Sequence, residues 1–312
     1  MKTTVILDDF FTWLKASSKA GKKLNPFVFI LVIACPFISY GQSNGTSYDK
    51  DLAPVRGNYK IFESLSPKPK SANLPIDQLK FPFDEAWADK VLSIKPVYLT
   101  NISANDFKIP APPANSSDQT RAELNYLLNL QYNRSLEDIT TSIYMSNNPE
   151  SPSDVGQQMG YWTDPQKLPL TDSLMDKVEK DGDFFLWSLK FKYARVRPYI
   201  VEPKIHDLEE SRASSYPSGH VTYAYIHAFI YEELAPEFKD FFIAKAYTMS
   251  RARQIIGVHY PSDCEGSRIF ARQFVTMLFE NEKFRRDFEN VKKEWAAKKQ
   301  ESLNNTLGAV KM

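Results

Sequence analysis

The chain has 312 residues, of which 43% are hydrophobic and 25% are charged, and its formal net charge is +1. This length and composition can bury one sizeable core or two smaller ones, which excludes an intrinsically disordered protein. The near-neutral charge and the lack of a dominant basic segment indicate that nucleic acid is not a partner.

The N-terminal region has the pattern of a secretory signal. Lys22 and Lys23 precede an apolar run over residues 26–38, and small residues follow it. Such a pattern is typical of exported proteins, and the run is too short to span a membrane comfortably. We therefore expect a signal peptide at 1–41, cleaved before Gln42, and a periplasmic or secreted bacterial protein.

The two cysteines add an alternative and a restriction. Cys35 ends the sequence Val-Ile-Ala-Cys, which resembles a bacterial lipobox and would give a lipid-anchored protein. If the signal is cleaved before Gln42, the mature chain keeps only Cys264, and one thiol forms no internal disulfide. Cys264 is interpreted as a small buried packing residue.

The rest of the chain is predicted to form an arm, a helical domain and a tail. Residues 42–80 are polar and punctuated by Ser and Pro, which predicts an extended arm or tether. Residues 81–300 form the domain, in which prolines keep 81–115 extended apart from one short helix near Phe83–Ser93. Residues 301–312 are a polar tail. The expected fold class is all-α, a single compact helical domain, because no region alternates with the period of a strand.

Caps and prolines bound the expected helices of the domain. The first starts at Ser116, which can form a capping box with Gln119. The next must end near Arg197, because Pro198 disfavours the helical conformation of the residue before it. We expect the later helices at Thr171 to Arg197, Ser218 to Leu234, Pro236 to Ile256, Ser262 to about Asn281, and from there to about Lys299.

A first motif supplies cations. Lys190 and Arg197 are seven residues apart, which would place them on one helical face, two turns apart. Two such cations can hold a dianion, Arg through forked hydrogen bonds and Lys as a point charge. Since Lys192 and Arg195 make the whole segment basic, a solvated charged face is the alternative.

A second motif is the start of an apolar helix. Ser218, Gly219 and His220 follow a proline, and the backbone N–H groups and dipole at such a start favour an anion. His220 can donate a proton to a leaving oxygen. An ordinary N-cap serine and a packing histidine are the alternatives.

A third motif pairs a histidine with a carboxylate. Asp263 follows His259 by four residues, and Arg253 precedes His259 by six. A carboxylate that binds one ring nitrogen fixes the tautomer and leaves the other nitrogen as a nucleophile. Arg253 adds a donor for an oxyanion. We expect no metal and no other cofactor, because the sequence has neither His-Glu-x-x-His nor paired cysteines.

Together the motifs read Lys-x6-Arg-Pro, Pro-Ser-Gly-His and Arg-x5-His-x3-Asp, in that order. This combination resembles the type-two phosphatidic acid phosphatase and vanadium haloperoxidase superfamily, and within it the bacterial class A non-specific acid phosphatases. The resemblance covers roughly Ile109 to Trp295, and the chain departs from it at Ala252, where the family usually has Ser. It implies a phosphohistidine on His259, oriented by Asp263, with His220 as acid and then base. It also implies the phosphate ligands Lys190, Arg197, Ser218, Gly219 and Arg253.

The expected function is that of a secreted, metal-independent acid phosphatase that hydrolyses soluble phosphate monoesters and can transfer phosphate to other alcohols. A vanadium-dependent haloperoxidase and a non-enzymatic oxyanion-binding protein are the alternatives. We expect small-molecule phosphate monoesters as partners and no stable membrane span in the mature chain. A homo-oligomer is compatible with the sequence.

Overall fold

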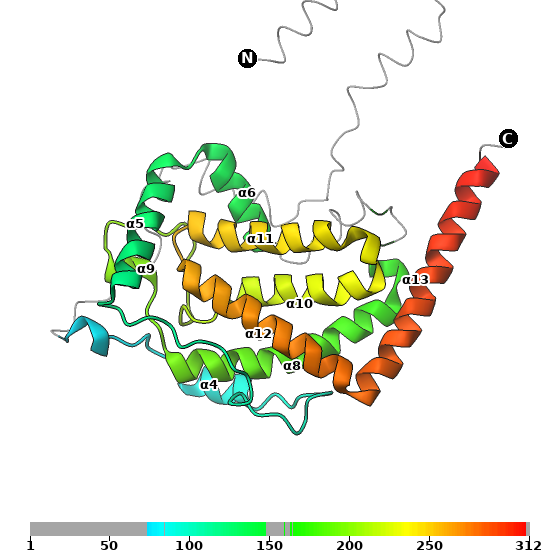
Figure 1. Ribbon diagram of the computed structural model, residues 1–312, viewed down its shortest axis with the longest axis horizontal. Helices are drawn as coiled ribbons and strands as arrows, with labels where there is room; N and C mark the ends of the chain where they lie inside the picture. Colours follow the sequence, from blue (N-terminus) through cyan, green and yellow to red (C-terminus); the bar gives the residue numbers. More distant parts are fainter. Residues whose placement is uncertain (1–73, 84, 148–158, 160–162, 164, 310–312) are drawn as a thin grey trace, which may run out of the picture. The chain divides into compact units, whose positions relative to one another are not determined.

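The computed structural model of the chain describes residues 74–309, apart from 84, 148–158, 160–162 and 164. Every regular element in these ranges is a helix, which confirms the all-α class. The signal peptide, Cys35 and most of the arm at 42–80 lie outside the described residues and stay predictions. In chain order the elements are η1 (Ile76–Gln78), α4 (Glu85–Leu92), α5 (Asp118–Asn133), α6 (Leu136–Asn147), η3 (Pro165–Lys167), α8 (Pro169–Tyr193), α9 (Pro198–Val201), α10 (Gly219–Leu234), η4 (Pro236–Phe238), α11 (Lys239–Ile255), α12 (Pro261–Glu280) and α13 (Glu282–Ala309) (Figure 1).

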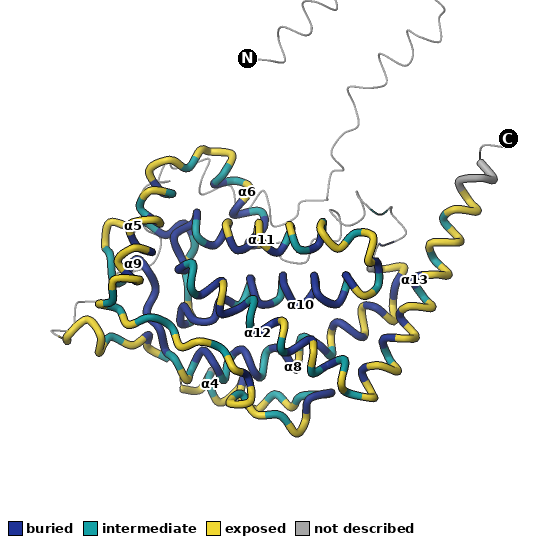
Figure 2. The backbone as a smooth tube through the Cα atoms, in the orientation of Figure 1, coloured by how far each residue is buried: buried dark blue, intermediate teal, exposed yellow. Residues whose placement is uncertain are grey.

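Helix α10 is the centre of the main apolar core. Its residues are largely apolar on all sides, which is typical of a helix that other helices enclose. Helices α11 and α12 pack along it, α8 also contacts it, and Figure 2 shows most of it as buried. The N-terminal end of α10, which carries the second motif, is therefore held in place by packing on several sides.

A second, smaller apolar cluster supports the turn between α11 and α12. Ile256 and Val258 in this turn pack with Leu127 of α5 and Ile139 of α6. Between them Gly257 has a φ of 79°, a conformation that strains residues with a side chain. The cluster and the glycine together fix the path of the chain just before His259.

The segment before α5 is held against α8 by one buried carboxylate. Asp181 of α8 accepts hydrogen bonds from the backbone N–H groups of Val97, Tyr98 and Leu99, the last two at 2.9 and 2.8 Å. Residues 94–115 contain no helix, and α4 lies just before them. The prediction of extended chain with one short helix in this region is thus confirmed.

The course of the chain after α8 differs from the prediction. The helix ends at Tyr193, because Ala194 takes a left-handed φ of 48° and its N–H closes the last turn on Lys190. Arg197 lies beyond this end, as the residue that precedes α9. The prediction that Lys190 and Arg197 are stacked on one helical face is therefore wrong, although both side chains reach the same site.

The structure differs from the prediction at two other helix ends and in one additional helix. The cap of α5 is Ser117, whose hydroxyl accepts from the N–H of Thr120, and not Ser116 with Gln119. Helix α6 had no counterpart in the prediction, and α13 continues ten residues past Lys299 to Ala309. Among the helices within the described ranges, none combines the length and the apolar character needed to cross a membrane.

Candidate active site

The three motifs meet at a cleft of about 590 Å³, where α8 and α11 end and α10 and α12 begin. This volume is typical of a pocket for a small organic molecule and exceeds what a phosphate ion alone would fill. Two of the predicted site residues, Ser218 and Asp263, are fully buried directly behind the cleft. The other six line it: Lys190, Arg197, Gly219, His220, Arg253 and His259. The structure thus brings all eight predicted residues together.

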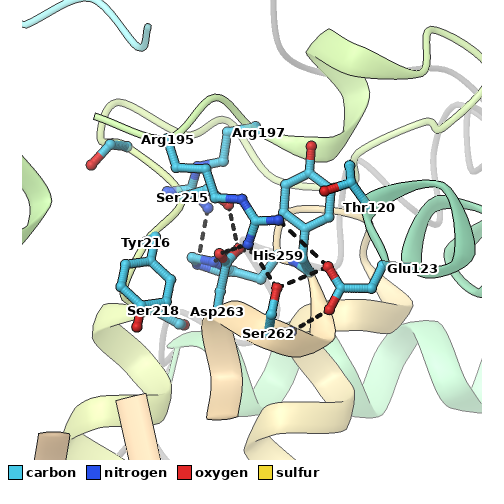
Figure 3. A network of polar contacts seen from close by, with 12 residues as sticks. Thr120, Glu123, Arg195, Arg197, Ser215, Tyr216, Ser218, His259, Ser262 and Asp263 are labelled. Carbon is cyan, nitrogen blue, oxygen red and sulfur yellow. Dashed lines mark hydrogen bonds and ion pairs between the residues drawn. The ribbon is translucent and has the colours of Figure 1, made fainter. Parts of the chain in front are cut away.

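His259 and Asp263 form the predicted pair. His259 Nδ1 lies 3.2 Å from Asp263 Oδ2, which also accepts from the N–H of Tyr260 at 2.9 Å and from the hydroxyl of Ser215 (Figure 3). Burial alone would raise the pKa of Asp263, but the charge of Arg195 and the hydrogen bond from His259 hold it well below its usual range. Asp263 is therefore ionised and accepts the proton on Nδ1.

The other nitrogen of His259 carries a lone pair. Arg197 Nη1 lies 2.9 Å from His259 Nε2, and since a guanidinium only donates, Nε2 is the acceptor. Burial and then the charge of Arg197 lower the pKa of His259 well below its ordinary value. His259 is thus neutral, with the tautomer that a nucleophilic Nε2 requires.

Lys190 and Arg197 are held by backbone carbonyl groups. Lys190 Nζ donates to Ser214 O at 2.8 Å, and Arg197 donates through Nε to Ala213 O at 2.9 Å and through Nη1 to Val258 O at 2.8 Å. Burial lowers the pKa of Arg197 to about 10, so its guanidinium stays charged at working pH. The neutral carbonyl partners do not compete with an anion for the charge of Arg197, whereas burial and then the charge of Arg197 lower the pKa of Lys190 well below its ordinary value.

The start of α10 offers unused polar groups. Ser218 is the N-cap, but its hydroxyl makes no capping bond and has no hydrogen-bond partner among the described residues. A Cβ built on Gly219 would come no closer than 3.5 Å to another part of the protein, at Leu186 Cδ2. The packing of the protein therefore does not require glycine at this position. A ligand bound close to the helix start would require it, because a Cβ would point into the space of that ligand.

His220 is a neutral imidazole in the structure. Its Nε2 lies 3.0 Å from the carbonyl oxygen of Ser146, so Nε2 carries the proton. The positive charge of Arg253, followed by burial, lowers the pKa of His220 to about 3. We expected a pKa near working pH, and the nearby arginine is the reason for the difference.

Arg195 is a site residue that the sequence reasoning missed. Its side chain is 2% exposed and donates to Asp263 Oδ1 at 2.6 Å (Figure 3). The Cζ atom of Arg195 also lies 3.8 Å from the centre of the Tyr260 ring, and its Nη2 lies 3.4 Å from Oε2 of Glu123 on α5. We interpreted Arg195 and Lys192 as cations of a generally basic segment, yet only Lys192 is exposed. An acidic residue on the apolar face of α5 was the signal for its partner.

Two other residues near the site pack in the interior. Ala252 belongs to the main apolar cluster. Cys264 is also buried, as predicted, and burial raises the pKa of its thiol to about 12. At this pKa the thiol is uncharged and is a poor nucleophile.

Part of the chain is similar to known proteins. Residues 183–286 match the model of the PAP2 superfamily, a stretch that contains all eight predicted site residues. The chain is 32% identical over 128 residues to a non-specific acid phosphatase of Providencia stuartii, covering 39% of this chain and 52% of the relative. It is 30% identical over 133 residues to an acid phosphatase of Zymomonas mobilis, covering 41% of this chain and 50% of the relative.

The chain spans about half the length of these curated relatives. Among solved structures, a transmembrane PAP2 type phosphatidylglycerolphosphate phosphatase from Bacillus subtilis covers 52% of this chain and 85% of its own, with 16% identity and a TM-score of 0.38. That likeness is too distant to inform the site. The family match and the curated relatives confirm the predicted resemblance.

Proposed function

We propose that the chain, which matches the PAP2 superfamily over residues 183–286, is a metal-independent acid phosphatase that hydrolyses soluble phosphate monoesters through a phosphohistidine intermediate. The state of His259 is the observation that supports this best. Its Nδ1–H is bound to an ionised Asp263, and its Nε2 presents a lone pair among buried cations. A structural histidine would need neither feature.

In the first step, Nε2 of His259 attacks the phosphorus atom and the bond from phosphorus to the ester oxygen breaks. Arg197, which donates to Nε2 in the structure, turns this donor to a phosphoryl oxygen. Lys190 and Arg253 neutralise further charge on the transferred group, which is the main way in which proteins accelerate such transfers. A protonated His220 gives its proton to the leaving oxygen, which departs as the alcohol.

In the second step, water attacks the phosphorus atom and the bond between phosphorus and Nε2 breaks. His220, now neutral, accepts the proton of the water. The site then holds inorganic phosphate and a neutral His259. An alcohol that replaces water in this step would receive the phosphoryl group, which is the proposed phosphotransferase activity.

Hydrolysis of p-nitrophenyl phosphate by the purified protein, with a chelator present, tests the proposal. We expect turnover that persists with the chelator and falls by at least about a thousandfold in His259→Ala. His227→Ala is the matched control. It removes a different buried histidine, which lies on α10, and it should retain turnover. An alkaline quench followed by mass spectrometry should find the phosphoryl group on His259.

Other outcomes would reject parts of the proposal. Full turnover by His259→Ala would show that this residue is not the nucleophile, and loss of activity with the chelator would show that a metal is needed. Halide oxidation after vanadate loading, without ester hydrolysis, would favour the haloperoxidase.

Export is proposed on the basis of residues 1–41 alone. Expression of the full chain in a bacterium, with mass determination of the protein in each fraction, tests it. A periplasmic or secreted product that begins at Gln42 is expected. A product with a lipid on Cys35 would support the anchored alternative, and an uncleaved chain in the cytoplasm would contradict export.

A further inference from the structure

The loop between α9 and α10 places a carboxylate on a cation that the proposed function assigns to phosphate. Glu209 lies on this loop and lines the cleft. Its two carboxylate oxygens accept hydrogen bonds from Nη1 and Nη2 of Arg253, both at 2.6 Å. This forked pairing is also the geometry in which an arginine binds two oxygens of a phosphate.

While this pair is intact, three of the five N–H groups of Arg253 are in use. Its Nη1 also donates to Ser146 Oγ at 2.6 Å, and its Nε has no hydrogen-bond partner among the described residues. The side chain of Arg253 is 2% exposed, whereas that of Glu209 is 32% exposed. The carboxylate therefore stands on the solvent side of the guanidinium.

Charge prevents Glu209 and a phosphate from sharing Arg253. Burial alone would raise the pKa of Glu209, but the charge of Arg253 and the hydrogen bonds from it lower the pKa to about 2. Glu209 is thus ionised at any pH at which a phosphatase works. A phosphate at the same guanidinium would lie beside a second negative charge in a poorly hydrated site, where repulsion is strong.

The part of the loop that carries Glu209 lies between two fixed points. On one side, the N–H of Leu208 donates to Ile256 O at 3.0 Å. On the other, the hydroxyl of Ser214 donates to Lys190 O at 3.0 Å and Ser214 O accepts from Lys190 Nζ at 2.8 Å. Residues 209–212 are half-buried or exposed, and the carbonyl oxygen of Ala213 accepts from Arg197 Nε at 2.9 Å. Glu209 can therefore leave Arg253 while both flanks stay in place.

We propose that Glu209 is an internal competitor of the substrate's phosphate group. Glu209 binds Arg253 and must leave it before phosphate binds there. This inference rests on the proposed function, because that function assigns Arg253 to phosphate. The exchange sets the affinity of the site for a phosphoryl group. The return of Glu209 to Arg253 also favours release of the inorganic phosphate product.

Calorimetric titration of the protein with inorganic phosphate tests this inference without requiring turnover. Glu209→Gln removes the charge and keeps the size of the side chain, and we expect it to bind phosphate roughly tenfold more tightly, which corresponds to about 1.4 kcal/mol. Glu210→Gln is the matched control. Its carboxylate is on the same loop but is 57% exposed and lies 3.7 Å from Arg212, so phosphate affinity should stay near that of the wild type.

Each outcome decides the inference. Phosphate binding by Glu209→Gln that is unchanged or weaker than in the wild type would overturn it, because Glu209 would then position Arg253 rather than compete for it. Equal gains in both variants would also overturn it, since general charge would be the cause. Glu209→Asp, which is too short to keep both hydrogen bonds, provides a second variant if Glu209→Gln does not fold, and it too must bind phosphate more tightly than the wild type. A wild type that binds phosphate but hydrolyses no ester would refute the proposed function and leave this comparison intact.

Discussion

Replacement of Arg195 by Met should damage the site through Asp263 without touching the cleft. In the wild type, burial favours the neutral form of Asp263, and the charge of Arg195 is the largest effect that opposes it. Arg195 also forms an ion pair with Glu123, so its removal leaves two buried carboxylates without the positive charge that they share. Breaking a buried ion pair by removing one partner costs about 3–5 kcal/mol of unfolding free energy.

The pH dependence gives this prediction its sign. The folded-state pKa of Asp263 is depressed in the wild type, so its contribution to stability is present above the unfolded pKa and is lost as the pH falls through the folded pKa. In Arg195→Met the folded pKa rises. The difference in unfolding free energy between the two proteins should therefore be largest near neutral pH and shrink in acid.

The loss of activity in Arg195→Met should, in contrast to the loss of stability, be largest in acid. A protonated Asp263 accepts the Nδ1 proton of His259 less well, so the acid limb of the pH–rate profile for p-nitrophenyl phosphate should move to higher pH in Arg195→Met. Lys192→Met, which removes an exposed cation three residues away, is the control for both denaturant unfolding and kinetics. A pH–rate profile of Arg195→Met that overlays that of the wild type would refute the reasoning.

Of the three remaining predictions, two concern the start of α10 and one concerns Gly266 of α12. Gly219→Ala should fold with unchanged thermal stability, because its Cβ meets nothing closer than 3.5 Å, yet lose phosphate affinity by calorimetry; unchanged affinity would place the phosphate elsewhere. By contrast, Gly266→Ala should lose at least about 1–3 kcal/mol of unfolding free energy, because its Cβ would fall on the ring of Tyr216, and a stable variant would contradict this packing. His220, whose pKa is lowered to about 3 mainly by Arg253, should titrate at higher pH once phosphate or vanadate compensates that charge. An NMR titration of its ring protons checks this, and an equally low pKa in the bound form would argue against its role as the acid.

The sequence predicted which groups meet, but not how the protein holds them. The motif residues converge because prolines and small residues fix the ends of the helices that carry them, and Gly219–Leu234 and Pro261–Glu280 were predicted closely. The end of α8 was not predictable, because alanine rarely adopts the left-handed conformation of Ala194. The pairing of Arg195 with Glu123 depends on a contact across 72 residues. An acidic residue on the apolar face of α5 indicates a buried partner, but it does not say which residue that partner is.

Burial alone does not distinguish a structural arginine from a binding one in this site. Arg195 and Arg253 are both 2% exposed, and each is paired with a carboxylate. The partner of Arg195 is fully buried and is held by the hydroxyl of Ser215 and the N–H of Tyr260 as well. The partner of Arg253 is one-third exposed, on a short stretch of loop between fixed flanks. An anion from solution can replace a carboxylate only if that carboxylate is able to leave its arginine. Arg195 therefore stays paired with Asp263, which orients His259. Arg253 can exchange Glu209 for a phosphate.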